Sequence, residues 1–133
     1  MLVAVLAIEL CFNEACLANG TTNVAEIRSV RQLQALSPEQ ARGQIPVRLR
    51  GVVTFHEPTW FQSFFQDPTG GIYVMNYDPS VRAGDEVEVE GSSSVGSAGS
   101  VIVARGGTNQ ARLRVLGKGS WPEAKLVTAE EVR

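Results

Sequence analysis

Residues 47–56 alternate, with a period of two, between a mostly apolar set and a mostly polar set. This is the period of a β-strand with one face buried, not that of a helix. A glycine interrupts the apolar set, and a glycine inside a strand commonly marks a bulge or the tight bend at a barrel corner. The alternation therefore predicts a long, half-buried strand, one face of which is formed by Val47, Leu49, Gly51, Val53 and Phe55.

A tight turn is predicted at residues 66–71, which read QDPTGG between two apolar runs. In such a turn Asp accepts hydrogen bonds from backbone amides, Pro presets φ, and Gly adopts a positive φ. The segment therefore predicts a β-hairpin. Because strand side chains alternate between faces, Ile72 and Val74 are expected on one face and Tyr73 on the other.

Further strands are predicted downstream of this hairpin. Residues 86–90 alternate cleanly, with their two valines expected inside and their glutamates expected in solvent. Short apolar runs at residues 101–104 and 113–116 supply two more strands. The Gly- and Ser-rich residues 91–100 between them are expected to form a mobile loop.

A short helical segment is predicted ahead of the strands. Ser29 is its expected N-cap, and apolar residues recur at helical spacing at Ile27, Val30, Leu33 and Leu36. Pro38 is expected to start a second turn, because proline is favoured in the first turn of a helix. Five or six short antiparallel strands after this segment predict an all-β chain. A small, partly closed barrel fits that count better than a sandwich, which usually has about seven strands.

Three segments resemble the OB-fold modules of bacterial proteins: residues 47–54 (VRLRGVVT), 64–74 (FFQDPTGGIYV) and 84–91 (GDEVEVEG). This resemblance covers about residues 45–117 and implies an OB-type Greek-key barrel with a short N-terminal helical lead-in. The lead-in at residues 27–39 resembles, more narrowly, the one before OB modules in the extracytoplasmic sensory region of bacterial sensor histidine kinases. It implies a non-catalytic input module of a signal-transduction protein, either as a fragment of a longer receptor or as a single-module relative.

The chain is divided into four segments. Residues 1–18 are a predicted signal peptide, 19–44 a linker with the helical lead-in, 45–120 the OB-fold domain, and 121–133 a connector that can begin a further module. A short apolar run and small residues before a cut after Ala18 favour export to the periplasm. No basic residue precedes the run and an acidic one interrupts it, so a buried N-terminal helix of a cytoplasmic protein is the alternative.

Catalytic and metal-binding patterns are sparse. His56 is the single histidine, so neither a zinc site with several ligands nor a Ser-His-Asp arrangement is expected. Removal of residues 1–18 would also take away both cysteines, Cys11 and Cys16. Asp67 and Asp85 lie in turn motifs, where a carboxylate commonly caps backbone amides. The chain is therefore expected to be no enzyme and to carry no cofactor or metal.

The OB resemblance implies a binding surface on strands two and three and the loops beside them. The candidate ligand-binding residues are Trp60, Phe61, Tyr73, Tyr77, Arg48, Arg50 and His56. Aromatic rings there can stack on bases or sugars, and arginines can pair with phosphate or carboxylate. About half of the aromatic residues in this region are expected in the core, and Phe64 and Phe65 must face opposite ways.

Several partners remain open at this stage. The expected partner is a small ligand, a glycan or a neighbouring receptor domain, with no membrane span, and a spacer without any ligand is also compatible. A single-stranded nucleic acid is the main alternative. Clustered arginines favour it, whereas the acidic residues 85–90, a net charge of −2 and a pI of about 5.4 oppose it.

Overall fold

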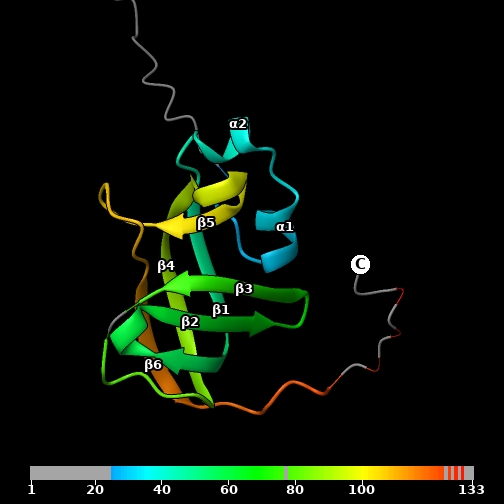
Figure 1. Cartoon of the computed structure of the whole chain (residues 1–133), viewed down its shortest axis with the longest axis vertical. Coiled ribbons are helices and arrows are strands. Elements are labelled where there is room, and N and C mark those ends of the chain that lie inside the picture. The colour runs from blue at the N-terminus through cyan, green and yellow to red at the C-terminus, as the bar shows by residue number, and fades with distance from the viewer. Residues whose placement is uncertain (1–24, 77, 125, 127, 129, 131–133) are drawn as a thin grey trace, which may run out of the picture.

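The computed structural model describes residues 25–76, 78–124, 126, 128 and 130, and Figure 1 shows their arrangement. The predicted signal peptide at residues 1–18 and the candidate residue Tyr77 lie outside the described residues. The helices and turns are α1 (Val30–Gln34), α2 (Pro38–Ala41) and the 3-10 turns η1 (Pro58–Trp60) and η2 (Ser97–Gly99). The strands are β1 (Pro46–Glu57), β2 (Gln62–Asp67), β3 (Gly70–Met75), β4 (Asp85–Val95), β5 (Val101–Ala104) and β6 (Arg112–Lys118).

All six strands belong to one antiparallel sheet, which confirms the all-β prediction. The order is β3-β2-β1-β4-β5, and β6 also pairs with β4. Both β5 and β6 therefore lie along the same edge of β4, β6 beside its first half and β5 beside its second half. In Figure 1, β2 and β3 run across the direction of β4.

The end of β3 lies close to the segment that leads into β6. A parallel bridge joins Met75 to Gln110, and Ala111 N donates to Met75 O at 3.3 Å. The side-chain amide of Asn76 donates to Ala111 O at 3.4 Å. The sheet therefore curls until the strands at its two ends approach each other.

Strand β1 takes part in both halves of the sheet. It pairs with β4 from Pro46 to Val52 and with β2 from Val52 onward. The register with β2 shifts between Val53 and Phe55, so the irregularity lies three residues after Gly51. Gly51 instead marks a close approach, because a Cβ built there would lie 2.2 Å from Gln66 O.

This shift overturns one prediction. Uninterrupted alternation places Phe55 on the buried face with Val53, but the side chain of Phe55 is 45% exposed. The extra residue in β1, Thr54, turns the following side chains to the opposite face, as a β-bulge does. The structure therefore places Phe55 on the outer surface of the sheet.

The core lies inside the curled sheet and under α1. Val87 and Val89 are fully buried, as predicted, and Ile72 and Val74 are buried while Tyr73 is exposed. The other buried apolar side chains of the cluster are Ile27, Val30, Leu33, Val47, Leu49, Val53, Phe65, Val81, Val103, Ala111 and Leu113. Helix α1 begins at its N-cap Ser29 and buries two of these, Val30 and Leu33.

The predicted loop at residues 91–100 is wrong for its first half, because β4 continues to Val95. Ser92 pairs with both Pro46 and Ala104. Ser93 is fully buried, and its hydroxyl donates to Ala41 O and accepts from Ile45 N, both at 2.9 Å. Pairing on both sides and these buried hydrogen bonds outweigh the local preference of Gly and Ser for loops.

Candidate ligand-binding face

Three aromatic side chains lie side by side on the outer surface of β1, β2 and β3. Phe55, Phe64 and Tyr73 are direct cross-strand neighbours in the register of these strands. Ring centroids are 5.9 Å apart for Phe55 and Phe64 and 6.0 Å apart for Phe64 and Tyr73, with interplanar angles of 58° and 68°. Tilted and edge-to-face pairs are favoured over flat stacking. We call these three residues the aromatic row.

The connection between β1 and β2 adds two more exposed rings. Trp60, the last residue of η1, is 70% exposed, and Phe61 is about half exposed. Phe61 adopts a left-handed backbone conformation with φ of 57°. The hydroxyl of Tyr73 donates to Phe61 O at 3.2 Å, which ties this loop to the aromatic row. The candidate face is the aromatic row together with Trp60 and Phe61.

Two open hollows adjoin the row, between β3 and the segment from η2 to β5. Their volumes are about 320 and 100 Å³, and Tyr73, Ser100 and Ile102 line both. Among the described residues that line them, none carries a charge. A larger hollow of about 860 Å³ lies elsewhere, beside β6, and the described residues that line it include no aromatic side chain.

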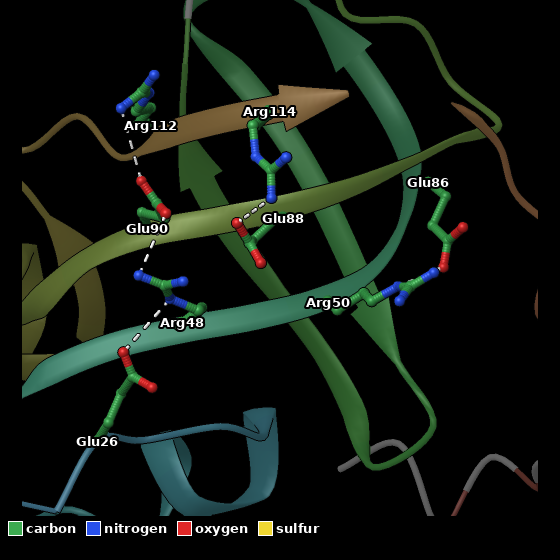
Figure 2. Close-up of polar contacts among 8 residues, drawn as sticks. All are labelled: Glu26, Arg48, Arg50, Glu86, Glu88, Glu90, Arg112 and Arg114. Carbon is green, nitrogen blue, oxygen red and sulfur yellow. Dashed lines mark hydrogen bonds and ion pairs between the residues drawn. The ribbon is translucent and has the colours of Figure 1, made fainter. Parts of the chain in front are cut away.

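The two candidate arginines, Arg48 and Arg50, belong to β1 and lie on a different part of the sheet, the outer surface formed by β1, β4 and β6. Figure 2 shows them in an ion-pair ladder that consists of Glu26, Arg48, Arg50, Glu86, Glu88, Glu90, Arg112 and Arg114. Four arginines face four glutamates, so their formal charges cancel.

Both candidate arginines have carboxylate partners in this ladder. Arg48 lies 3.4 Å from a carboxylate oxygen of Glu26 and 3.5 Å from one of Glu90. Nε of Arg50 donates to Glu86 at 2.8 Å, and this hydrogen bond lowers the pKa of Glu86 and raises that of Arg50. The structure therefore does not bring the arginines together with the aromatic candidates.

His56 faces away from the aromatic row, because it follows Phe55 in the strand. Its Nδ1 lies 2.7 Å from Ser63 Oγ, and its Nε2 lies 2.9 Å from Asp78 O. Since a carbonyl can only accept, Nε2 carries a proton and donates to Asp78. His56 is half-buried and joins β1 and β2 to the segment that follows β3.

Sequence reasoning missed one member of the face and the partners of the arginines. Phe55 was missed because regular alternation places its side chain in the core, and the bulge that turns it outward cannot be recognised from the sequence. Opposite charges did recur with period two in residues 48–50 and 86–90, but only the pairing of β1 with β4 makes them neighbours.

The hairpin turn and its capping carboxylates are confirmed: Asp67 accepts from Thr69 N and Gly70 N, and Asp85 accepts from Arg82 N. The positive φ expected of a glycine in the turn at residues 66–71 is wrong, because neither Gly70 nor Gly71 adopts one; both belong to β3 and keep its extended backbone.

Asp85 gives a testable pH dependence. Its buried carboxylate lies 2.5 Å from Lys118 Nζ, and that hydrogen bond is the main cause of its lowered pKa. Because the pKa is lower in the folded state, the carboxylate stabilises the fold fully above about pH 4 and loses this effect as pH falls through the folded value. We expect the urea midpoint of Asp85→Asn to depend less on pH between about pH 5 and 2 than that of the unsubstituted protein. Glu123→Gln is the control, and an unchanged pH dependence in Asp85→Asn would contradict this account.

None of the helices in the part of the chain that the structure describes is long and apolar enough to span a membrane. Comparisons with models of protein families, with curated protein sequences and with solved structures find no match for this chain.

Proposed function

We propose that this chain is a non-catalytic binding module with an OB-type barrel, and that the candidate face holds its ligand. The strand order supports the barrel. Strand β1 pairs with both β2 and β4, and β5 and β6 together act as one interrupted strand along β4. An isolated bridge joins Met75, at the end of β3, to Gln110, two residues before β6, and this approach supports closure of the sheet into a barrel. An OB fold is such a small, partly open Greek-key barrel.

One observation carries the functional proposal: three exposed aromatic side chains form a row on β1, β2 and β3, and two more exposed aromatic residues, Trp60 and Phe61, lie in the connection between β1 and β2. They lie on the strands and on the first loop that OB folds use for binding, and the hollows beside Tyr73 lie next to the loop before β5. A contiguous exposed apolar patch commonly marks a binding surface, and aromatic residues are enriched in such sites. The proposed face is therefore the outer surface of β1, β2 and β3.

The resemblance to sensor histidine kinase modules supports a proposal about the cellular role of the chain. It supports an extracytoplasmic sensory role as the input part of a bacterial signal-transduction protein. Cell fractionation of the full-length gene product tests this role, with recovery in the periplasm or on its membrane expected and strictly cytoplasmic recovery contradicting it.

Trp60 and Trp121 offer a matched pair of variants for the binding claim. Both are exposed, but Trp121 follows β6 and lies against Gly84, outside the candidate face as defined. In a screen of small-molecule fragments by calorimetry, we expect Trp60→Ala to weaken the best-binding fragments about tenfold, because exposed aromatic anchors dominate such sites. Trp121→Ala should leave the affinity unchanged. Equal losses in both variants, or none in either, would contradict the proposed face.

A single-stranded nucleic acid is the second candidate, because the aromatic row could stack on bases. Such binding depends on free cations that neutralise phosphates, and it weakens steeply with salt. The ion-pair ladder already occupies Arg48 and Arg50. We therefore rank this candidate second, and binding of a short oligo-dT at low salt, lost at high salt, would favour it.

A further inference from the structure

We infer that the hollow beside β6 is a separate binding site, and that it takes a small anion with carboxylate or phosphate groups. The hollow has a volume of about 860 Å³, which is within the range of small-molecule sites. Its described lining includes the segment between β5 and β6 but none of the five aromatic residues of the candidate face. The inference therefore concerns another part of the molecule and does not depend on the proposed function.

The described residues that line this hollow carry an excess of positive charge. They include three arginines, Arg105, Arg112 and Arg114, and one carboxylate, that of Asp78. Hydrogen bonds from Ser80 lower the pKa of Asp78, so this carboxylate is ionised at neutral pH. Three arginines against one aspartate leave a formal charge of +2 on the lining. A concave surface with an excess of one charge concentrates ions of the opposite sign.

Two of these arginines belong to the ion-pair ladder, and they are held with different strength. Arg114 donates to Glu88 at 2.6 Å, and this hydrogen bond raises the pKa of Arg114. Arg112 approaches Glu90 only to 3.7 Å, beyond hydrogen-bond distance, and Glu90 is shared with Arg48 (Figure 2). The side chain of Arg112 is 54% exposed, and an exposed ion pair of this kind contributes little to stability. Arg112 can therefore exchange this contact for a ligand at little cost.

Arg105 has no carboxylate to exchange. Its exposed side chain makes no ion pair or hydrogen bond with another described residue. Its backbone is fixed in a tight turn, because Arg105 and Thr108 exchange two backbone hydrogen bonds of 3.1 Å. Between them Gly106 and Gly107 adopt φ of 58° and 78°, as a two-residue type I′ turn requires. A fixed turn thus presents an unpaired guanidinium beside the hollow.

A carboxylate or phosphate group matches the donors that line this hollow. The planar guanidinium has parallel N–H donors that fit two oxygens of either group. The backbone amide of Gly106 and the side-chain amide of Gln110 make no hydrogen bond with another described residue, so they can donate to further oxygens. Because two guanidiniums, those of Arg105 and Arg112, are available, a ligand with two anionic groups is favoured over one with a single group.

A nucleic acid or an acidic protein segment would also bind arginines, and these are the competing outcomes. Each needs available cations along an extended surface. The neighbours of Arg112 in the ladder, Arg48 and Arg114, are held by glutamates. The available positive charge is therefore confined to the hollow, which favours a small ligand.

The test is titration of the ¹⁵N-labelled full chain with citrate, a polycarboxylate, and with pyrophosphate, followed by NMR and calorimetry. At least one of them should shift the backbone resonances of Gly106 and Arg112, and the one that binds identifies the anionic group. Arg105→Gln should weaken this binding about tenfold and Arg112→Gln about fivefold. Arg31→Gln, which removes an exposed arginine of α1, is the matched control and should leave the affinity unchanged.

Other outcomes would overturn the inference. Failure of both probes to bind, or equal losses in Arg105→Gln and Arg31→Gln, would show that the hollow is no anion site. Sulfate and chloride that bind as tightly as citrate and pyrophosphate would mean an adventitious ion only. Tighter binding of oligo-dT or polyglutamate at these arginines would replace the small anion with a nucleic acid or an acidic protein segment. Each of these outcomes leaves the candidate face, which neutral fragments test, unaffected.

Discussion

Gly51→Ala is expected to destabilise the fold by about 3 kcal/mol or more. A Cβ at this position would lie 2.2 Å from Gln66 O and 2.8 Å from Phe65 Cζ. The first of these atoms belongs to the backbone of β2, which is held by pairing with β1 on one side and β3 on the other. Neither β1, which carries Gly51, nor β2 can move away from the other without breaking the hydrogen bonds between the strands. The added methyl group therefore cannot be accommodated by a local shift.

Thermal unfolding measures this effect, and the expected loss corresponds to a fall in Tm of about 10–20 °C. Gly71→Ala in β3 is the matched control, because the nearest atom to its Cβ would be Phe65 O at an ordinary 3.6 Å. This variant should change stability by less than about 1 kcal/mol. A Tm for Gly51→Ala close to that of Gly71→Ala would show that β1 and β2 do not approach each other as described.

Asp67→Ala is expected to have the second large effect, a loss of about 3 kcal/mol. The buried carboxylate accepts four hydrogen bonds: from Val30 N at 2.8 Å, from Thr69 N at 2.7 Å, from Thr69 Oγ1 at 2.6 Å and from Gly70 N at 3.0 Å. It thus joins the first turn of α1 to the hairpin turn between β2 and β3. Its removal leaves the amide of Val30, a fully buried residue, without an acceptor.

Urea unfolding and amide hydrogen exchange together test this prediction. Exchange at Val30 should accelerate along with the global loss, because α1 depends on Asp67 for its attachment. Asp67→Asn, which keeps an acceptor, should lose less than Asp67→Ala. Asp78→Ala removes a carboxylate that accepts from Ser80 N in an exposed turn, and we expect it to cost at most about 1 kcal/mol. Equal losses at both aspartates would contradict the structural role of Asp67.

Local patterns predicted the elements whose causes are local. The N-cap at Ser29, the turn at Asp67 and the inward valines of β4 each depend on residues within a few positions, and the structure confirms them. The opposite faces of Phe64 and Phe65 follow from strand parity alone.

Features that depend on pairing between distant segments could not be predicted in this way. The bulge at Thr54 arises where β1 leaves one partner strand for another, and it moves Phe55 to the outer surface. The serines of β4 have the composition of a loop, and they are part of a strand only because β1 and β5 pair with this segment. The glutamates that hold Arg48 and Arg50 come from other segments, and their contact exists only in the assembled sheet.

The most direct test of the central claim is an NMR map of ligand contacts on the ¹⁵N-labelled full chain. Fragments from a neutral library should shift resonances of β2, β3 and the Trp60 loop, and saturation transfer should connect bound fragments to the ring protons of Phe64 and Tyr73. The account predicts that these contacts cluster on the candidate face. Contacts that cluster instead on the ion-pair ladder, or in the hollow beside β6, would contradict it.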